Sequence, residues 1–334
     1  MYELLGITLV LAMLLTVNAF ATAFATVLWH LFKRPLLRCS ARTRAELLFV
    51  MRLGPPVIAL VWVAAFLIPS YLAHEPYSTD EFVSKKLGAL AAISAVGVAC
   101  AIWRGLRSWL ATRSLLKKWL TNSTPFELNN LEVPVFRLRH AFPIVAVVGT
   151  FRPRLFVAEQ VLETLSEEEL AAAIAHEYGH MAARDNLKRA MLRTSKAALL
   201  IIPCGRSLDR AWGEASESAA DEHAAQQSSA VALNLASALV RVARLIPTES
   251  RPVMPSSTFL VGGEETRGVK ARVRRLVELS ATDPQMLASS APLFRFTPWV
   301  LTLTMVVIGL VIAGRPEVLA SVHSFIEQVV KLLS

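Results

Sequence analysis

The residues best suited to chemistry in this chain form the pentapeptide His176-Glu177-Tyr178-Gly179-His180. Spacing of four residues puts both imidazoles on one face of a helix, where they can bind the same metal ion. Zinc held in this way lowers the pKa of a bound water, and a neighbouring carboxylate can take its proton and later pass it to a leaving amine. The motif therefore predicts zinc-dependent peptide hydrolysis, with His176 and His180 as ligands, Glu177 as the base and one zinc ion per chain.

A catalytic zinc site needs a third protein ligand besides the water. Glu217 and Asp221 lie four positions apart and are separated by the small residues Ser218, Ala219 and Ala220. Small residues let a helix approach its neighbour closely, and the spacing keeps both carboxylates on one side. We expect Glu217 to bind zinc and Asp221 to accept the free ring N–H of a zinc-bound histidine. The alternative is a solvated acidic helix face.

The segment before the histidines predicts the helix that carries them. Ser166 is followed three positions later by Glu169, which is typical of a capping box at a helix start. Gly179 is a poor helix former, and we expect it where another element packs closely. Weaker expectations are that Asp185 caps or orients the end of this helix and that Tyr178 or Arg272 stabilises the oxyanion of the reaction.

Three short β-rich runs precede this helix, at 133–138, 144–148 and 154–157, separated by Pro143, Gly149 and Pro153. They predict a small sheet. Because peptidases can hold an extended substrate along a sheet edge, the second run is a candidate substrate strand. An equally good alternative is a buried core strand. The candidate substrate strand consists of Ile144, Val145, Ala146, Val147 and Val148.

The composition predicts a membrane protein, since 54% of the 334 residues are hydrophobic and only 18% are charged. Four segments reach the length of about 20 apolar residues that a membrane-spanning helix needs, or come close to it. They cover about 4–32, 55–73, 87–103 and 296–313. A cleaved signal peptide is a competing interpretation of the first, but the chain has no basic start and the apolar run is too long.

Lysines and arginines lie mainly between the first two segments and after the third. By the positive-inside rule both stretches should be cytoplasmic, which puts the N- and C-termini outside the inner cell membrane in a multi-pass topology. This placement accounts for the net charge of +9, so we expect the bilayer, not nucleic acid, as the partner of the basic residues.

The fold class expected is a four-span α-helical membrane protein with an inserted α+β zinc peptidase domain. Residues 1–118 would hold three spans, and 119–295 the cytoplasmic peptidase domain, which is large enough for its own core. Residues 296–313 would form the fourth span. The tail, 314–334, is amphipathic at helical spacing, as in a helix on the membrane surface or one packed against the spans.

Three motifs resemble the gluzincin metallopeptidase domain of the membrane antirepressors that sense beta-lactam antibiotics. They are Ser166-Glu-Glu-Glu-Leu170, His176-Glu-Tyr-Gly-His180 with Arg184-Asp185, and Glu217-Ser-Ala-Ala-Asp-Glu222. The likeness covers about 1–313 and implies the same base and ligands as above. It also implies signal transduction, with a cytosolic transcriptional repressor or the chain itself as substrate. The extracellular penicillin-binding sensor of those receptors has no counterpart here, so antibiotic sensing is not expected.

Two alternatives remain. The prenyl-protein and heat-shock membrane proteases of quality control share HExxH and a later ExxxD, but usually place spans between or after these motifs. Here only 197–204 is apolar between His180 and Glu217, too short to cross a bilayer, which favours the antirepressor type. The other alternative is a signal transducer with non-catalytic zinc, although structural zinc is normally held by four Cys-rich ligands.

Overall fold

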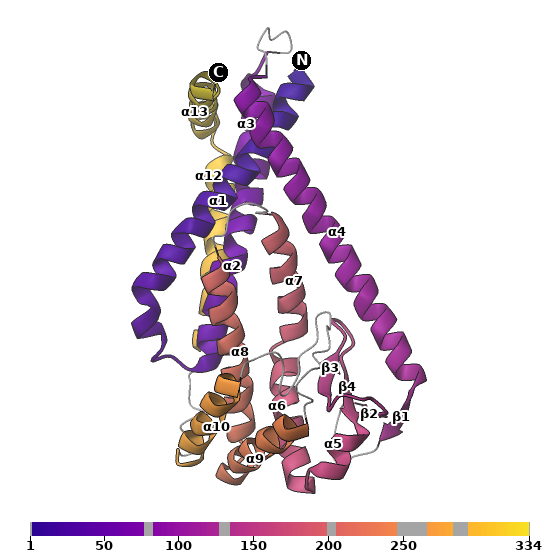
Figure 1. The fold of residues 1–334 in the computed structure, drawn as a ribbon. Helices are drawn as coiled ribbons and strands as arrows, with labels where there is room; N and C mark the ends of the chain where they lie inside the picture. Colours follow the sequence, from indigo (N-terminus) through magenta and orange to yellow (C-terminus); the bar gives the residue numbers. More distant parts are fainter. Residues whose placement is uncertain are drawn as a thin grey trace.

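The computed structural model describes residues 2–76, 83–126, 134–198, 205–245, 266–282 and 293–333. Long helices gather at the end that holds both termini, and a smaller domain of helices and strands lies at the other end (Figure 1). The first part of the chain forms α1 (Tyr2–Leu36), α2 (Ala41–Trp62), the π-helical turn η1 (Val63–Leu67), α3 (Ile68–His74) and α4 (Lys85–Thr121).

In the part of the chain that the structure describes, three helices are long and apolar enough to cross a membrane, and they contain the first three predicted spans. They are Tyr2–Leu36, Ala41–His74 and Lys85–Thr121. Large apolar side chains on them point outward, with Phe20 75% and Phe24 65% exposed. An outward apolar surface suits contact with lipid, because water would penalise it.

The predicted fourth span lies in α12 (Leu293–Ala313), which is followed by α13 (Pro316–Leu333). Within the described residues, Val306–Ala313 and Pro316–Lys331 meet the criteria for a span only as a pair, bent by 92°. Pro316 cannot continue the preceding helix, which accounts for the bend at this point. The described residues therefore contain three candidate spans, or four if the bent pair is one, and the fourth stays a prediction.

The amphipathic tail packs against the spans, one of the two alternatives considered for it. Val322 and Ile326 of α13 are buried in a cluster with Leu5 and Leu9 of α1 and Leu67 of η1. The hydroxyl of Ser70 also donates to the carbonyl of Leu319 at 2.8 Å. These contacts tie the C-terminal helix to the first two spans.

The second part of the chain forms a small sheet with helices beside it. Its elements are β1 (Ser123–Phe126), β2 (Val135–Leu138), β3 (Val145–Val148), β4 (Arg154–Ala158), α5 (Glu159–Thr164), α6 (Glu167–Ala182), α7 (Asp185–Ala198), α8 (Arg206–Ala225), α9 (Ser229–Leu245) and α10 (Thr266–Ser280). The strand order is β1-β2-β4-β3, with β2 and β4 parallel and the other pairs antiparallel.

All three predicted strands occur, with small shifts at their ends, and residue 133 lies outside the described part. β1 was not predicted. It contains Pro125, and an edge strand is where a sheet tolerates proline. The core of this domain joins the sheet to α6 and α9 and includes Trp119 from the end of α4. α4 thus runs without a break across 118/119, where composition placed the domain boundary.

The second candidate span packs against α8, the helix that carries Glu217. Arg52 of α2 is 1% exposed, and its Nε donates to Asp209 Oδ1 of α8 at 2.8 Å. The backbone N–H of Ala41 donates to Glu222 Oε2 at 3.0 Å. A buried ion pair that loses one partner costs several kcal/mol, so these contacts fix α8 relative to α2.

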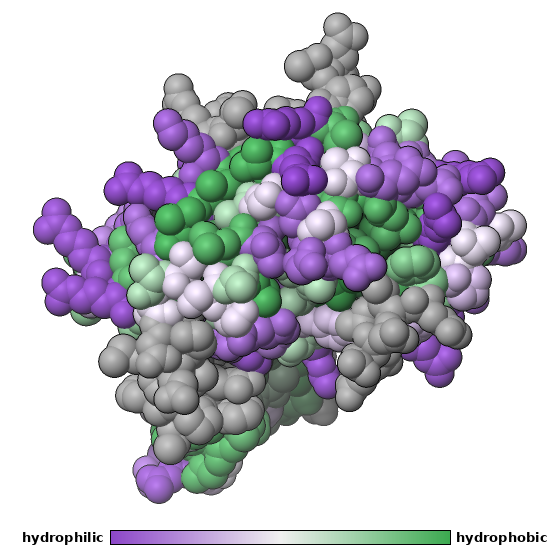
Figure 2. All heavy atoms as spheres, turned by 90° about the horizontal axis from the view of Figure 1, so that it is seen from below, coloured by the Kyte–Doolittle hydropathy of each residue, from purple (hydrophilic) through white to green (hydrophobic). Residues whose placement is uncertain are grey.

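The end of the molecule opposite the termini has a different surface from the spans. Hydrophilic residues are spread over this face, with smaller hydrophobic patches between them (Figure 2). Such a mixture is ordinary for a surface in contact with water.

Candidate metal centre

α6 carries the two histidines and begins as predicted. Ser166 Oγ accepts from the N–H of Glu169 at 3.3 Å, while Glu169 Oε2 accepts from the N–H of Ser166 at 3.0 Å. This is a complete capping box. The apolar residues that follow lie in the core, so the helix is held on both sides. His176 and Glu177 are fully buried, and His180 is 2% exposed.

α8 crosses α6 at Gly179. A Cβ built on this glycine would lie 2.9 Å from the Cα of Ala220, closer than real Cβ contacts allow. The predicted role of Gly179, a close approach of another element, is therefore met. Since Ala220 lies between Glu217 and Asp221, the contact brings both carboxylates to the histidines.

The three predicted ligands converge. His176 Nε2 lies 3.7 Å from Glu217 Oε2, and His180 Nε2 lies 3.6 Å from Glu217 Oε1. One donor atom from each residue lies within 4.8 Å of the others. Two imidazoles and a carboxylate at this separation are compatible with a catalytic zinc site that leaves room for water.

Buried atoms at the site fit a bound cation. Within the described residues, His180 Nε2, Glu217 Oε2 and both carboxyl oxygens of Glu177 are buried without a hydrogen-bond partner. Buried polar atoms are normally paired, and orphans call for a ligand or water. Zinc would satisfy the first two, and a water beside it would satisfy Glu177.

Each of the two histidines contacts a carboxylate through its Nδ1 atom. Asp221 Oδ1 lies 2.9 Å from His176 Nδ1, as predicted for a partner outside the metal ligands. Asp185 Oδ2 lies 2.7 Å from His180 Nδ1 and also accepts from Ser216 Oγ at 2.7 Å. Such partners fix the orientation of the ring and leave Nε2 to bind a metal.

Asp185 therefore orients the second histidine, which is more specific than the helix-end role expected from sequence. The turn that places it contains Arg184, whose φ of 55° is left-handed and rare for a residue other than glycine. That turn ends α6 and starts α7 with Asp185. The position of Asp185 five residues after His180 suggested that the two side chains could meet. The spacing alone did not predict that the turn would direct Asp185 back to the imidazole.

Two arginines border the ligands. Arg272 of α10 contacts Asp221 Oδ1 at 2.7 Å and Glu217 Oε2 at 3.3 Å, and its Nη2 lies 3.4 Å from His176 Nε2. Arg189 of α7 donates to Glu217 Oε1 at 3.1 Å. Arg272 thus reaches the site where it was expected. Arg189 was missed, because no spacing rule links it to Glu217.

These charges keep the carboxylates ionised. Burial tends to raise the pKa of Glu217, but His180, Arg272 and Arg189 hold it well below its usual range. Burial acts likewise on Asp221, and Arg272 and His176 lower its pKa to about 2. Both groups are therefore anions at neutral pH, suited to a ligand and to a hydrogen-bond acceptor.

Glu177 and His180 are shifted the other way. Burial raises the pKa of Glu177 to about 8, which outweighs the nearby charge of His180. Burial alone would lower the pKa of His180, but Glu217 and Asp185 raise it to about 10. A metal ion must displace the His180 proton on binding. Glu177, with a pKa near neutrality, is able to accept and release a proton.

The candidate substrate strand lies beside this site. β3 is at the edge of the sheet, and Ile144 to Val148 are all buried, so both alternatives for it describe the structure. Ile144 O accepts from the N–H of Ala158, and hydrogen-bonded positions alternate along an antiparallel pair. The N–H and C=O of Val147 therefore point away from β4. The Val147 carbonyl accepts instead from Asn186 Nδ2 at 2.8 Å. Substrate pairing along β3 stays a prediction.

Replacing Asp221 with alanine should lower zinc affinity by about 10- to 100-fold. His176 loses the acceptor that orients it, and Arg272 loses one of its two carboxylate partners beside the ligands. Zinc titration against a competing chelator measures the effect. Glu214→Ala, which removes an exposed carboxylate from the same helix, is the control. Equal affinity in the two variants would contradict the role given to Asp221.

Comparison with known families agrees with this chemistry. Residues 146–292 match the family model described as Peptidase family M48. The matched stretch contains His176, Glu177, His180, Glu217 and Asp221. The match covers less than half of the chain and indicates similarity to a family of zinc-dependent metallopeptidases, but it does not support the antirepressor subfamily that the motifs resemble. No curated protein matches the chain.

Proposed function

We propose that this chain is an integral-membrane zinc metalloendopeptidase that cleaves a protein substrate. The strongest support is that His176, His180 and Glu217 bring possible ligand atoms within 4.8 Å of one another, some of them buried without a hydrogen bond. The Glu177 carboxyl is buried beside them. Three helices able to cross a membrane support the membrane setting.

The roles of the residues follow from their positions. Zinc bound by the three ligands would supply the charge that lowers the pKa of a water and polarises the peptide carbonyl. Glu177 accepts a proton from that water and later donates it to the nitrogen of the leaving amine. Asp221 and Asp185 hold the imidazoles in place through Nδ1. Arg272 lies close enough to help neutralise negative charge that develops on the substrate.

We further propose that the peptidase domain is cytoplasmic, with both termini on the outer side of the inner membrane. The basic stretches after the first and third spans support this orientation. On the antirepressor hypothesis the substrate is a cytosolic transcriptional repressor or the chain itself. The quality-control hypothesis, in which the substrate is a damaged membrane protein, is the alternative.

Removing zinc should abolish cleavage reversibly. The full chain in detergent, incubated with itself and with candidate repressors, should lose activity on chelation. Activity should return when about one zinc per chain is restored, because three protein ligands define a single site. Product formation and bound zinc are measured together, with magnesium re-addition as the control. Undiminished cleavage at zero bound zinc would exclude the proposed mechanism.

A further inference from the structure

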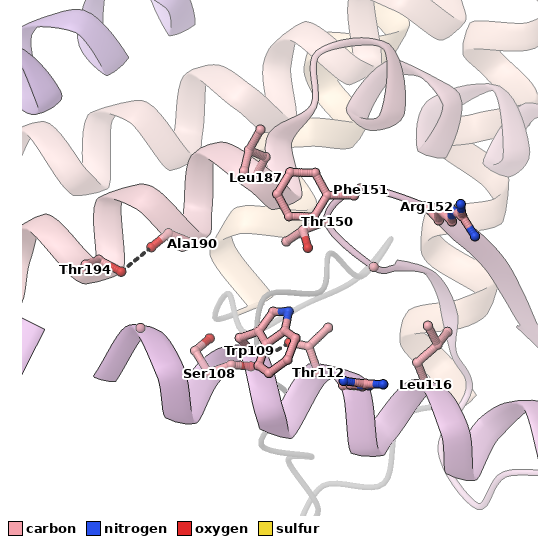
Figure 3. A pocket seen from close by; sticks show the side chains of 13 residues that line it. Ser108, Trp109, Thr112, Leu116, Thr150, Phe151, Arg152, Leu187, Ala190 and Thr194 are labelled. Atoms are coloured by element: carbon pink, nitrogen blue, oxygen red, sulfur yellow. Dashed lines mark hydrogen bonds between the residues drawn. The ribbon is translucent and has the colours of Figure 1, made fainter. Parts of the chain in front are cut away.

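A cavity lies away from the three candidate metal ligands, between α4 and the domain that carries them. Its volume is about 350 Å³, and it is bounded by α4, by the turn from β3 to β4 and by α7. Trp109 and Thr112 of α4 face Phe151 and Leu187 across it (Figure 3). α4 and α7 close one end, because a Cβ on Gly105 would lie 3.3 Å from Thr194 Oγ1.

This cavity shares wall residues with another cavity that borders one of the candidate metal ligands. A neighbouring cavity of about 300 Å³ is lined by His180 and Asp185 on one side and reaches the same turn. Gly149, Phe151 and Leu187 line both cavities. The turn that holds Phe151 therefore borders both the space beside His180 and the space beside α4.

The walls favour an apolar side chain. Phe151 is 79% exposed and Trp109 is 47% exposed, and both line the cavity. Large aromatic side chains left open to water are costly unless a partner covers them, and they are the usual anchors of binding surfaces. Because Phe151 contributes little to the core, its exposure points to a binding role.

The charges at the cavity favour a negatively charged group next to that side chain. Arg113 and Arg152 line it, and no acidic residue is among its described lining. Within the part of the chain that the structure describes, neither guanidinium forms an ion pair with a carboxylate. Arg152 and Leu116 lie at one end and Thr194 at the other (Figure 3). A carboxylate at the arginine end would be drawn there by charge.

We propose that this cavity binds a bulky apolar side chain of the protein substrate, with an acidic residue nearby in the substrate held by Arg113 and Arg152. The inference rests on the proposed peptidase function and specifies its substrate class. An anionic phospholipid offers similar chemistry, but it would need no route to His180. The shared lining of the two cavities therefore favours a polypeptide.

Binding of short peptides to the full chain carrying Glu177→Gln, in detergent, tests this without relying on cleavage. The probe is a fluorescein-labelled dodecapeptide of Gly and Ser with one Phe and one Glu two positions later. Replacing its Phe by Ser should weaken binding about tenfold, as should Phe151→Ser in the protein. Met191→Ser, at a residue of α7 that is 40% exposed and outside the cavity, is the control and should leave affinity unchanged.

A charge exchange tests the arginines. Arg113→Glu should weaken binding of the Glu peptide and strengthen binding of a matched peptide with Lys in place of Glu. Lys118→Glu on the same helix should change neither affinity. Equal peptide affinity in Phe151→Ser and the parent would overturn the proposal. So would loss of labelled phosphatidylglycerol binding in these variants with peptide binding intact. Because no bond is cut, these results are independent of the chelation experiment on the proposed function.

Discussion

Glu177→Gln is expected to lower the rate of proteolysis by about 10²- to 10⁴-fold while zinc remains bound. The amide keeps the size of the carboxyl but cannot take a proton from water. The Glu177 carboxyl is buried, and an amide oxygen at this position can still accept from the backbone N–H of Val147, so the packing should be kept. His176, His180 and Glu217 keep their positions, and zinc content should be that of the parent.

The rate of cleavage and the zinc content of the same sample decide this prediction. Glu167→Gln is the matched control, because it makes the same change at an exposed position in the first turn of the same helix. It should cleave at the parental rate. Parental activity in Glu177→Gln would rule out Glu177 as the base, whereas loss of zinc would show that it acts on metal binding instead.

Gly179→Ala should cost the protein both its zinc and its activity. The new methyl group would lie 2.9 Å from the Cα of Ala220, and backbone cannot yield as a flexible side chain does. α8 must therefore move away from α6 and carry Glu217 and Asp221 with it. Overpacking of this kind costs about 1–3 kcal/mol of stability, and misplaced partners lower metal affinity by about 10- to 100-fold or more.

Gly213→Ala is an internal control for that experiment. Gly213 also lies in a helix, α8, but a Cβ there meets nothing within 4 Å. The substitution should raise stability by about 0.5–1 kcal/mol, since alanine favours helix over glycine. The melting temperatures of the two variants should therefore shift in opposite directions, and zinc affinity should fall only in Gly179→Ala. Similar results at both positions would mean that the close crossing at Gly179 does not position the ligands.

The local parts of the site could be predicted from sequence because they depend on helical spacing. The capping box, the two histidines and the pair Glu217 and Asp221 each lie within one or two helical turns. The contacts of Arg189 and the orienting role of Asp185 could not be predicted, since they depend on how α7 leaves α6 through the left-handed Arg184. Tertiary packing sets those directions.

The fold shows the same division. Apolar length predicted three helices able to span, but composition could not show that α4 continues through the expected domain boundary, because a change in polarity does not end a helix. β1 was missed because Pro125 disfavours a strand in sequence. The choice of the antirepressor type depended on where apolar segments lie, and the family match at 146–292 does not support it.

The unbroken α4 also sets the distance between the expected membrane-spanning segment and the metal-binding domain. Its apolar stretch ends near Trp103. Its last turn, which ends at Thr121, includes Trp119 of the core that joins the sheet to α6 and α9. At about 1.5 Å per residue, the part between them is a rod of about 27 Å. If the apolar stretch is fixed in the bilayer, α4 acts as a ruler that holds the cutting point at a set distance from the membrane. A substrate anchored in the same membrane would then be cut at a set distance from its anchor. Residues inserted in the substrate between its anchor and the cut bond would move the cut to a new bond, nearer the anchor than the original bond by the same number of residues.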